Sequence, residues 1–216
     1  MMKNLLYKEF KLASHPTTYI FLSFSLMFLI PNYPSYIQFL YICMSIFFIF
    51  LNGRINQDVF YTVSLPIRKS DVVKARVLMI AIIQLFQVII AIPIALLSIR
   101  MYPEGNLAGI DPNVAFFGFV FIVFSAFNIG FLPLFYRTGY KTGIPFLVGG
   151  IASILAYVCL EMLVWIPSNM QRFLDTTDPE MIIKHLPILL GGMMVWVSVF
   201  VFVYIRSARN FEHVDV

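Results

Sequence analysis

Few side chains in this sequence could carry chemistry, and they lie far apart. Glu161 is the single ionisable residue inside the long apolar segments. His15, His185 and His213 show no metal-ligand spacing, and no serine, histidine and aspartate set indicates a hydrolase. The sequence therefore predicts no active site, no metal and no cofactor on this chain.

A nucleotide-binding loop is also missing. The nearest approach to a phosphate-binding P-loop is Gly139-Tyr140-Lys141-Thr142, where Tyr140 occupies the position that requires the second glycine. The upstream glycine is absent as well. We therefore expect no ATP site on this chain.

The composition indicates a chain that uses lipid as its main solvent. Of 216 residues, 60% are hydrophobic and 12% are charged, about half the charged fraction of a soluble domain. Apolar runs near the length needed to cross a bilayer predict an all-α integral membrane protein with six transmembrane helices. These spans are 17–30, 36–51, 77–99, 114–135, 144–166 and 188–205. The first two are short, and a re-entrant hairpin over 17–51 is the alternative.

The distribution of basic residues predicts the orientation. With both termini in the cytoplasm, only Arg100, Arg172 and Lys184 fall on the outer side, and all other Lys and Arg residues face inward. The net charge of +4 therefore indicates membrane topology and contact with anionic lipid. It does not indicate nucleic-acid binding.

Residues 3–14 predict an amphipathic helix at the membrane interface, with a disordered basic tail as the alternative. Apolar residues at helical spacing share one face, and lysines on the other can reach lipid phosphates. The two sets are Leu5, Leu6, Phe10 and Ala13, and Lys3, Lys8 and Lys11.

The loop 52–76 is the longest inner connection. An apolar face in it predicts a short helix lying on a partner, and a solvated basic loop is the alternative. The residues of that face are Val59, Phe60, Val63 and Leu65.

The end of this loop predicts how the next helix begins. Pro66 disfavours helix at Leu65. Ser70 is suited to cap the following helix, and Lys74 and Arg76 are expected to anchor it among lipid headgroups.

The whole chain resembles the membrane subunit, or permease, of ATP-binding-cassette exporters of the second bacterial class. The similarity lies in the Lys8-Glu9-Phe10 elbow, the six spans and the loop that ends at 65–76. In that family this loop holds the coupling helix, which enters a cleft of a cytoplasmic ATPase. The resemblance implies a coupling helix over about 56–64, with ATP and Mg²⁺ on the partner chain. Its contacts would come from Asp58, Val59, Phe60, Tyr61 and Val63.

Polar residues on one face of the third and fourth predicted spans are candidates for a translocation pathway. They are Gln84 and Gln87 in the third span and Ser125 and Asn128 in the fourth. Hydrogen bonding between neighbouring helices is the alternative. Glu161 would be either a hydrated carboxylate near the headgroups or a contact for a cationic substrate near the outer exit.

Small residues in the fifth predicted span are candidates for a dimer interface. Gly149, Ala152, Ser153 and Ala156 share one helix face, which allows two backbones to approach closely. In the resembled family the first and fifth spans contribute to the contact between subunits. A packing groove within one subunit is the alternative.

These observations predict a permease subunit of an ATP-driven exporter in the bacterial plasma membrane. It would work with a second permease subunit and move amphipathic or hydrophobic molecules, with peptides expected. The branch it resembles is the one that exports phenol-soluble modulins and similar amphipathic peptides. The alternative is a membrane-embedded peptide-binding or immunity protein without ATP-driven transport.

Overall fold

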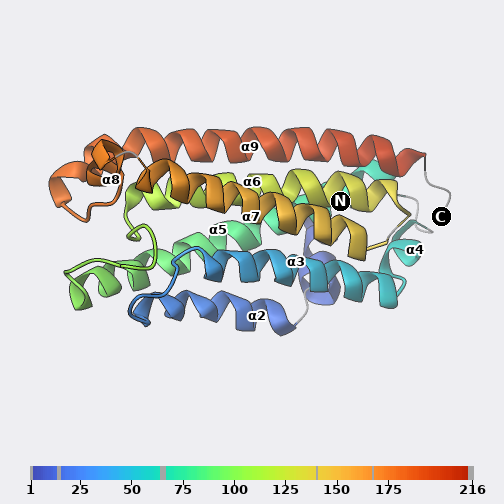
Figure 1. Cartoon of the computed structure of the whole chain (residues 1–216). Coiled ribbons are helices and arrows are strands. Elements are labelled where there is room, and N and C mark those ends of the chain that lie inside the picture. Colours follow the sequence, from blue (N-terminus) through green and yellow to red (C-terminus); the bar gives the residue numbers. More distant parts are fainter. Residues whose placement is uncertain (1, 14–15, 64–66, 140, 167, 214–216) are drawn as a thin grey trace.

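The computed structural model describes residues 2–13, 16–63, 67–139, 141–166 and 168–213, and within these ranges it contains helices and no strands (Figure 1). The helices are α1 (Met2–Lys8), η1 (Glu9–Ala13), α2 (Pro16–Ser23), η2 (Phe24–Leu29), α3 (Ile37–Ile55), α4 (Asp58–Val63), α5 (Lys69–Met101), α6 (Val114–Arg137), α7 (Gly143–Trp165), α8 (Ser168–Leu174), η3 (Pro179–Met181) and α9 (Ile182–Glu212). The predicted all-α class is confirmed.

Among the described residues, five helices are long and apolar enough to cross a membrane: α3, α5, α6, α7 and α9. A sixth span is reached only if the N-terminal pair over Met2–Leu12 and Pro16–Leu29 is counted as one bent span. The structure thus has five or six candidate spans, and the first predicted one is the unusual member.

That first segment changes helix type along its length. The 8 residues of α2 are α-helical and the 6 residues of η2 form a 3₁₀-helix. Because a 3₁₀-helix rises about 2.0 Å per residue instead of 1.5 Å, the two together reach about 24 Å. The turn after η2 is tied to the loop before α6, where the Asn106 side chain donates to the Tyr33 carbonyl at 2.9 Å. The α2–η2 segment therefore reaches the same end of the bundle as that loop.

The spanning helices form an elongated bundle with α6 at its centre (Figure 1). Aromatic rings fill the interior around α6, and the fully buried members include Phe116, Phe124, Phe127, Phe131 and Phe135. By contrast, α7 and α9 expose much of their apolar surface, as expected for helices that face lipid.

Glycines allow two close contacts with α6. A Cβ atom on Gly118 would lie 2.6 Å from the carbonyl oxygen of Ile188 in α9. One on Gly130 would lie 2.8 Å from the Cα of Gly149 in α7. Both obstacles are backbone atoms, so a side chain at either position would force the helices apart.

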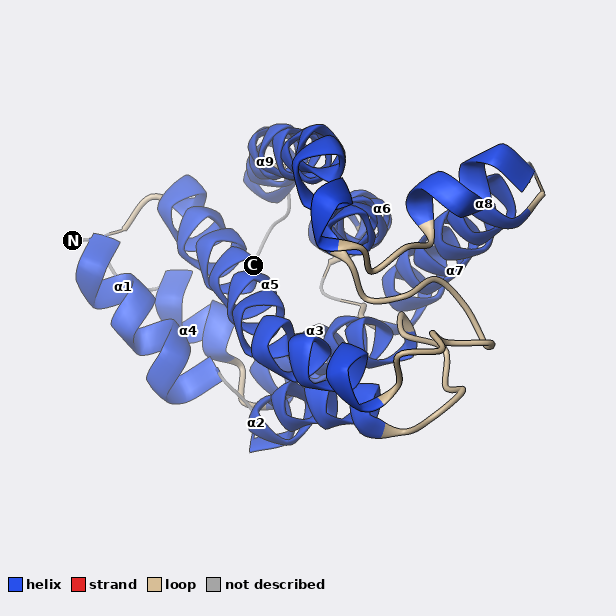
Figure 2. Ribbon diagram, turned by 90° about the vertical axis from the view of Figure 1, so that its left-hand side faces the viewer, coloured by secondary structure: helices blue, strands red, loops and turns tan. Residues whose placement is uncertain are grey.

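The two ends of the bundle differ in structure. One end, the α8 end, carries α8 and the loops, and there Asn113 caps α6 through Phe116 N and donates to the Leu174 carbonyl. The other end, the α4 end, carries α4 and α1, and α1 lies across the bundle axis (Figure 2). The C-terminal part of α9 also ends there (Figure 1).

Candidate functional site

The helix α4 lies at the α4 end between α3 and α5, within the predicted coupling segment. It begins at Asp58, just after Gln57, whose positive φ of 51° turns the chain away from α3. Tyr61 on this helix is 63% exposed. The side chains of Val59, Phe60 and Val63, and residues 64–66, lie outside the described part of the structure. The predicted apolar face of α4 therefore stays a prediction.

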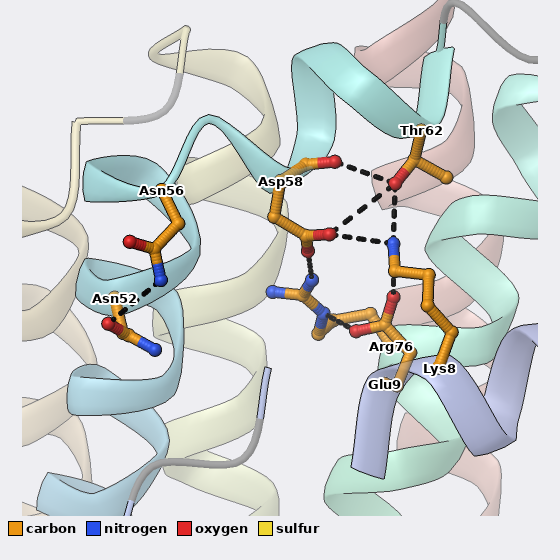
Figure 3. Close-up of polar contacts among 7 residues, drawn as sticks. All are labelled: Lys8, Glu9, Asn52, Asn56, Asp58, Thr62 and Arg76. Carbon is orange, nitrogen blue, oxygen red and sulfur yellow. Dashed lines mark hydrogen bonds and ion pairs between the residues drawn. The ribbon is translucent and has the colours of Figure 1, made fainter. Parts of the chain in front are cut away.

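Five side chains around α4 form one connected polar cluster, which we call the Arg76 network (Figure 3). Arg76 donates through Nε to the Glu9 carboxylate and through Nη2 to the Asp58 carboxylate. Lys8 Nζ lies 2.7 Å from Asp58 Oδ1 and 3.3 Å from Glu9 Oε1. It also donates to the Thr62 hydroxyl. The network therefore contains two cations and two carboxylates.

The centre of this network is buried. The side chains of Glu9 and Arg76 are 1% and 3% exposed. Buried charges are costly unless they are paired, and a guanidinium can serve two carboxylates at once because its donors form a rigid planar fork. Burial opposes ionisation of Asp58, but the charges of Arg76 and Lys8 outweigh it and lower its pKa.

Helix α3 provides the space for the guanidinium. A Cβ atom on Gly53 would lie 3.2 Å from Arg76 Nη1. The guanidinium carbon lies 5.4 Å from the centre of the Phe50 ring, a cation–π contact. Four segments therefore meet at Arg76: η1, α3, α4 and α5.

This arrangement corrects two expectations. Arg76 does not reach lipid headgroups, since it is buried in ion pairs. Ser70 is not the N-cap of α5, because the helix begins at Lys69 with Arg68 as its N-cap. The carboxylate of Asp58, a candidate contact for the ATPase, is turned toward Arg76 and Lys8 (Figure 3), and its contact with an ATPase stays a prediction.

Sequence reasoning missed Glu9 as a functional residue. The available signal was an acidic side chain between Lys8 and Lys11 in a helix expected to lie on anionic lipid. In the structure Glu9 starts the π-helical turn η1 and pairs with a residue 67 positions further along the chain.

Most of the pathway candidates make hydrogen bonds inside the bundle. The Gln84 and Asn128 amides pair reciprocally, at 3.1 and 3.0 Å, and Trp196 Nε1 donates to Gln84 Oε1 at 2.9 Å. Gln87 donates to the Ser25 hydroxyl at 3.0 Å. The Ser125 hydroxyl bonds to a carbonyl of its own helix. Because all four candidates are buried, this geometry supports the alternative of polar contacts between helices.

Glu161 lies apart from these residues, toward the α8 end. Its Oε1 atom is 3.4 Å from the Ile110 backbone nitrogen, a long hydrogen bond. A Cβ atom on Gly109 would lie 3.0 Å from the same oxygen. The carboxylate is half-buried and packs against the loop before α6, so the structure does not join it to Gln84 and Asn128.

Asp111 and Asp175 are among the carboxylates in the loops at the α8 end. Asp175 Oδ1 accepts a hydrogen bond from Asp111 N at 2.9 Å, and Asp111 Oδ1 accepts one from Asn106 N at 2.7 Å. Burial raises the pKa of both side chains, and the charge of Asp175 raises that of Asp111 further. A cavity of about 410 Å³ lies beside Asp111, and residues of η2 and of the C-terminal end of α5 also line it.

The small-residue face of α7 is partly occupied within the chain. Gly149 packs against Phe127 and Phe131 of α6, and Ser153 is 1% exposed. Ala152 is half-buried and Ala156 packs against the core. This packing supports the alternative of a groove within one subunit.

The fold defines a multi-pass membrane protein, and a comparison with family models identifies its family. The model described as ABC-2 family transporter protein matches residues 4–211. The chain therefore belongs to the ABC-2 transporter family and is a membrane permease component of an ABC transporter. Comparisons with curated proteins and with solved structures gave no match. The peptide-exporting branch stays a prediction.

Proposed function

We propose that this chain is the permease subunit of an ATP-driven exporter and that a separate cytoplasmic ATPase docks on α4. The observation that carries the proposal is the position of α4, a short helix with an exposed aromatic side chain at one end of the bundle. Ion pairs hold this helix to α5 and the elbow. A helix held in this way can transmit force, whereas a loose tether cannot.

The orientation follows from the charges on the two ends. Exposed basic side chains gather at the α4 end: Arg54, Arg68, Lys74, Arg137, Lys141, Arg206 and Arg209. The positive-inside rule favours this end as the cytoplasmic one. We propose a bacterial plasma membrane as the location, with both termini inside, and a cytoplasmic reporter fused after Val216 is expected to be active.

For the substrate we propose amphipathic or hydrophobic molecules, with peptides as the first class to test. The membrane-facing surfaces of α7 and α9 are apolar, and Phe202 in α9 is among the exposed aromatic side chains. A molecule that partitions into the inner leaflet could approach such surfaces without crossing water. The loops at the α8 end are short, which leaves little room for an extracellular receptor domain.

Two copies of the chain, or this chain and a related one, would complete the transporter. Since Gly149 and Ser153 pack against their own chain, a contact on α7 would use its outward face. Cysteine at Leu155, which is 58% exposed, is expected to crosslink two copies more readily than cysteine at Ser153. Equal crosslinking at both positions would contradict this assignment of faces.

The docking proposal is tested by purifying a tagged chain from its native membranes and identifying an ATP-binding-cassette ATPase in the complex. Burial of a Phe side chain is worth about 2–3 kcal/mol, so Phe60→Ala is expected to weaken capture by about one to two orders of magnitude. Tyr61→Ala is expected to weaken it as well. The matched control is Tyr19→Ala, which removes an equally exposed tyrosine from α2. Unchanged capture by both α4 variants would refute docking on this helix.

A further inference from the structure

The Arg76 network joins three segments that are distant in the sequence. Glu9 belongs to the elbow, Asp58 to α4 and Arg76 to α5, and both carboxylates bind the same guanidinium (Figure 3). One buried guanidinium therefore links both α4 and the elbow to α5.

Charge balance does not require this bridge. Lys8 alone already neutralises Asp58, since Nζ lies 2.7 Å from its Oδ1. Without Glu9 and Arg76, the pair of Lys8 and Asp58 would still be neutral. A buried ion pair is also weak evidence of stabilisation, because desolvation offsets much of its attraction. What the bridge adds is geometry, since the planar guanidinium sets the direction of both carboxylates.

Helix α5 extends from this bridge to the opposite end of the molecule. The helix runs from Lys69 to Met101, and the part from Arg76 to Met101 spans about 38 Å at 1.5 Å per residue. At its far end, Ser98 and Met101 line the cavity of about 410 Å³ between the loops and η2. The helix is continuous through Pro93, so movement of its Arg76 end can be passed to the residues that line the cavity.

We propose that Arg76 is a positioning residue for coupling: it fixes α4 and the elbow to α5, so that movement of a docked ATPase is passed to the α8 end through α5. This proposal rests on the proposed function, because it assumes an ATPase on α4. It assigns no contact with the ATPase to Arg76 or Glu9, both of which are buried.

The test follows a reporter at the far end of α5. Met101 is 52% exposed, and Met101→Cys places a thiol there in a chain that also carries Cys43→Ala and Cys159→Ala. The complex with its ATPase is labelled with a maleimide in the absence of nucleotide and again after trapping with ATP and orthovanadate. The ratio of the two labelling rates measures how strongly the ATPase moves this end of α5.

The informative variant is the double substitution Glu9→Gln with Arg76→Met. It removes one charge of each sign and leaves Lys8 paired with Asp58, so it avoids the unpaired buried carboxylate that Arg76→Met alone would create. The matched control is Lys74→Met, which removes an exposed positive charge from the same helix. The double variant is expected to capture the ATPase within about threefold of the parent chain. Its nucleotide response at Met101→Cys is expected to be about tenfold smaller than that of the parent. The control is expected to keep both.

Each outcome separates this proposal from the docking proposal. If the parent chain captures no ATPase, the proposed function fails, and this proposal fails with it. If all three chains capture the ATPase and the double variant responds like the parent, Arg76 has no positioning role. Loss of capture in the double variant would also refute the role, because the network would then form the docking surface. A parent complex without any nucleotide response at Met101 refutes transmission through α5.

Discussion

Gln84 is predicted to be a structural residue that holds three helices together. It makes three hydrogen bonds, two with Asn128 of α6 and one with Trp196 of α9. Hydrogen bonds between membrane helices are worth about 0.6 kcal/mol each on average. Gln84→Leu should therefore lower the free energy of unfolding by about 2 kcal/mol.

For variants of the two partner residues, the loss of unfolding free energy should follow the number of hydrogen bonds that each variant removes. Asn128→Ala loses two and is expected to cost about 1.2 kcal/mol, and Trp196→Phe loses one and should cost about 0.6 kcal/mol. Both hydrogen bonds of Asn128 are already lost in Gln84→Leu, so adding Asn128→Ala removes no further hydrogen bond. The double variant should then cost about 2 kcal/mol instead of about 3, a coupling energy of about 1 kcal/mol.

The assay is reversible unfolding of the purified chain in mixed micelles, with export by each variant measured in parallel. Ser125→Ala is the control, because its hydroxyl bonds to the Phe121 carbonyl of the same helix and should contribute little between helices. Export should fall in proportion to the loss of folded protein. If Gln84→Leu and Asn128→Ala leave stability unchanged and abolish export, the two amides line a pathway and the structural interpretation is wrong.

Two further predictions concern close packing and pH. Gly118→Ala should destabilise the bundle by at least about 2 kcal/mol, because the new Cβ would lie 2.6 Å from the Ile188 carbonyl oxygen. Gly191→Ala is the control and should be neutral, because the space around Gly191 is open. Equal melting temperatures for the two variants would contradict the glycine contact. Burial and the charge of Asp175 raise the pKa of Asp111 in the folded chain. Protonation of Asp111 therefore favours folding, and this contribution is lost as the pH rises through the folded-state pKa. Asp111→Asn should raise the melting temperature at pH 7 and lose this advantage toward pH ~4, and a variant less stable than the parent at pH 7 would contradict this prediction.

The parts of this fold that hydropathy determines could be predicted from the sequence. Apolar runs of bilayer length correspond to α3, α5, α6, α7 and α9 because a helix is the form in which a single segment satisfies its own backbone in lipid. A short helix in the loop 52–76 was predicted from apolar residues at helical spacing, from the proline after them and from the family resemblance. The 3₁₀ geometry of η2 was not foreseeable, because α-helix and 3₁₀-helix share one hydrophobic composition.

The polar contacts could not be predicted because each depends on a partner far away in the chain. The sequence pattern around Gln84 is the same whether its side chain faces a pathway or the amide of Asn128, 44 positions later in the chain. Arg76 was placed among lipid headgroups because basic residues at helix ends commonly lie there. Its burial requires two carboxylates and the space beside Gly53, which only the folded chain brings together.

The unequal lengths of the spanning segments have a consequence for the surrounding lipid. The α2–η2 segment reaches only about 24 Å, whereas the hydrocarbon core of a bilayer is about 30 Å thick. Tyr19, Ile20 and Leu26 on this segment are exposed, so a bilayer in contact with them would have to adapt to its length. The bilayer beside α2 and η2 is expected to thin by about 6 Å, while the longer helices α7 and α9 accommodate a full-thickness membrane by tilting. Shorter acyl chains should therefore collect along the N-terminal side of the protein, and membrane thickness should affect this side before any other.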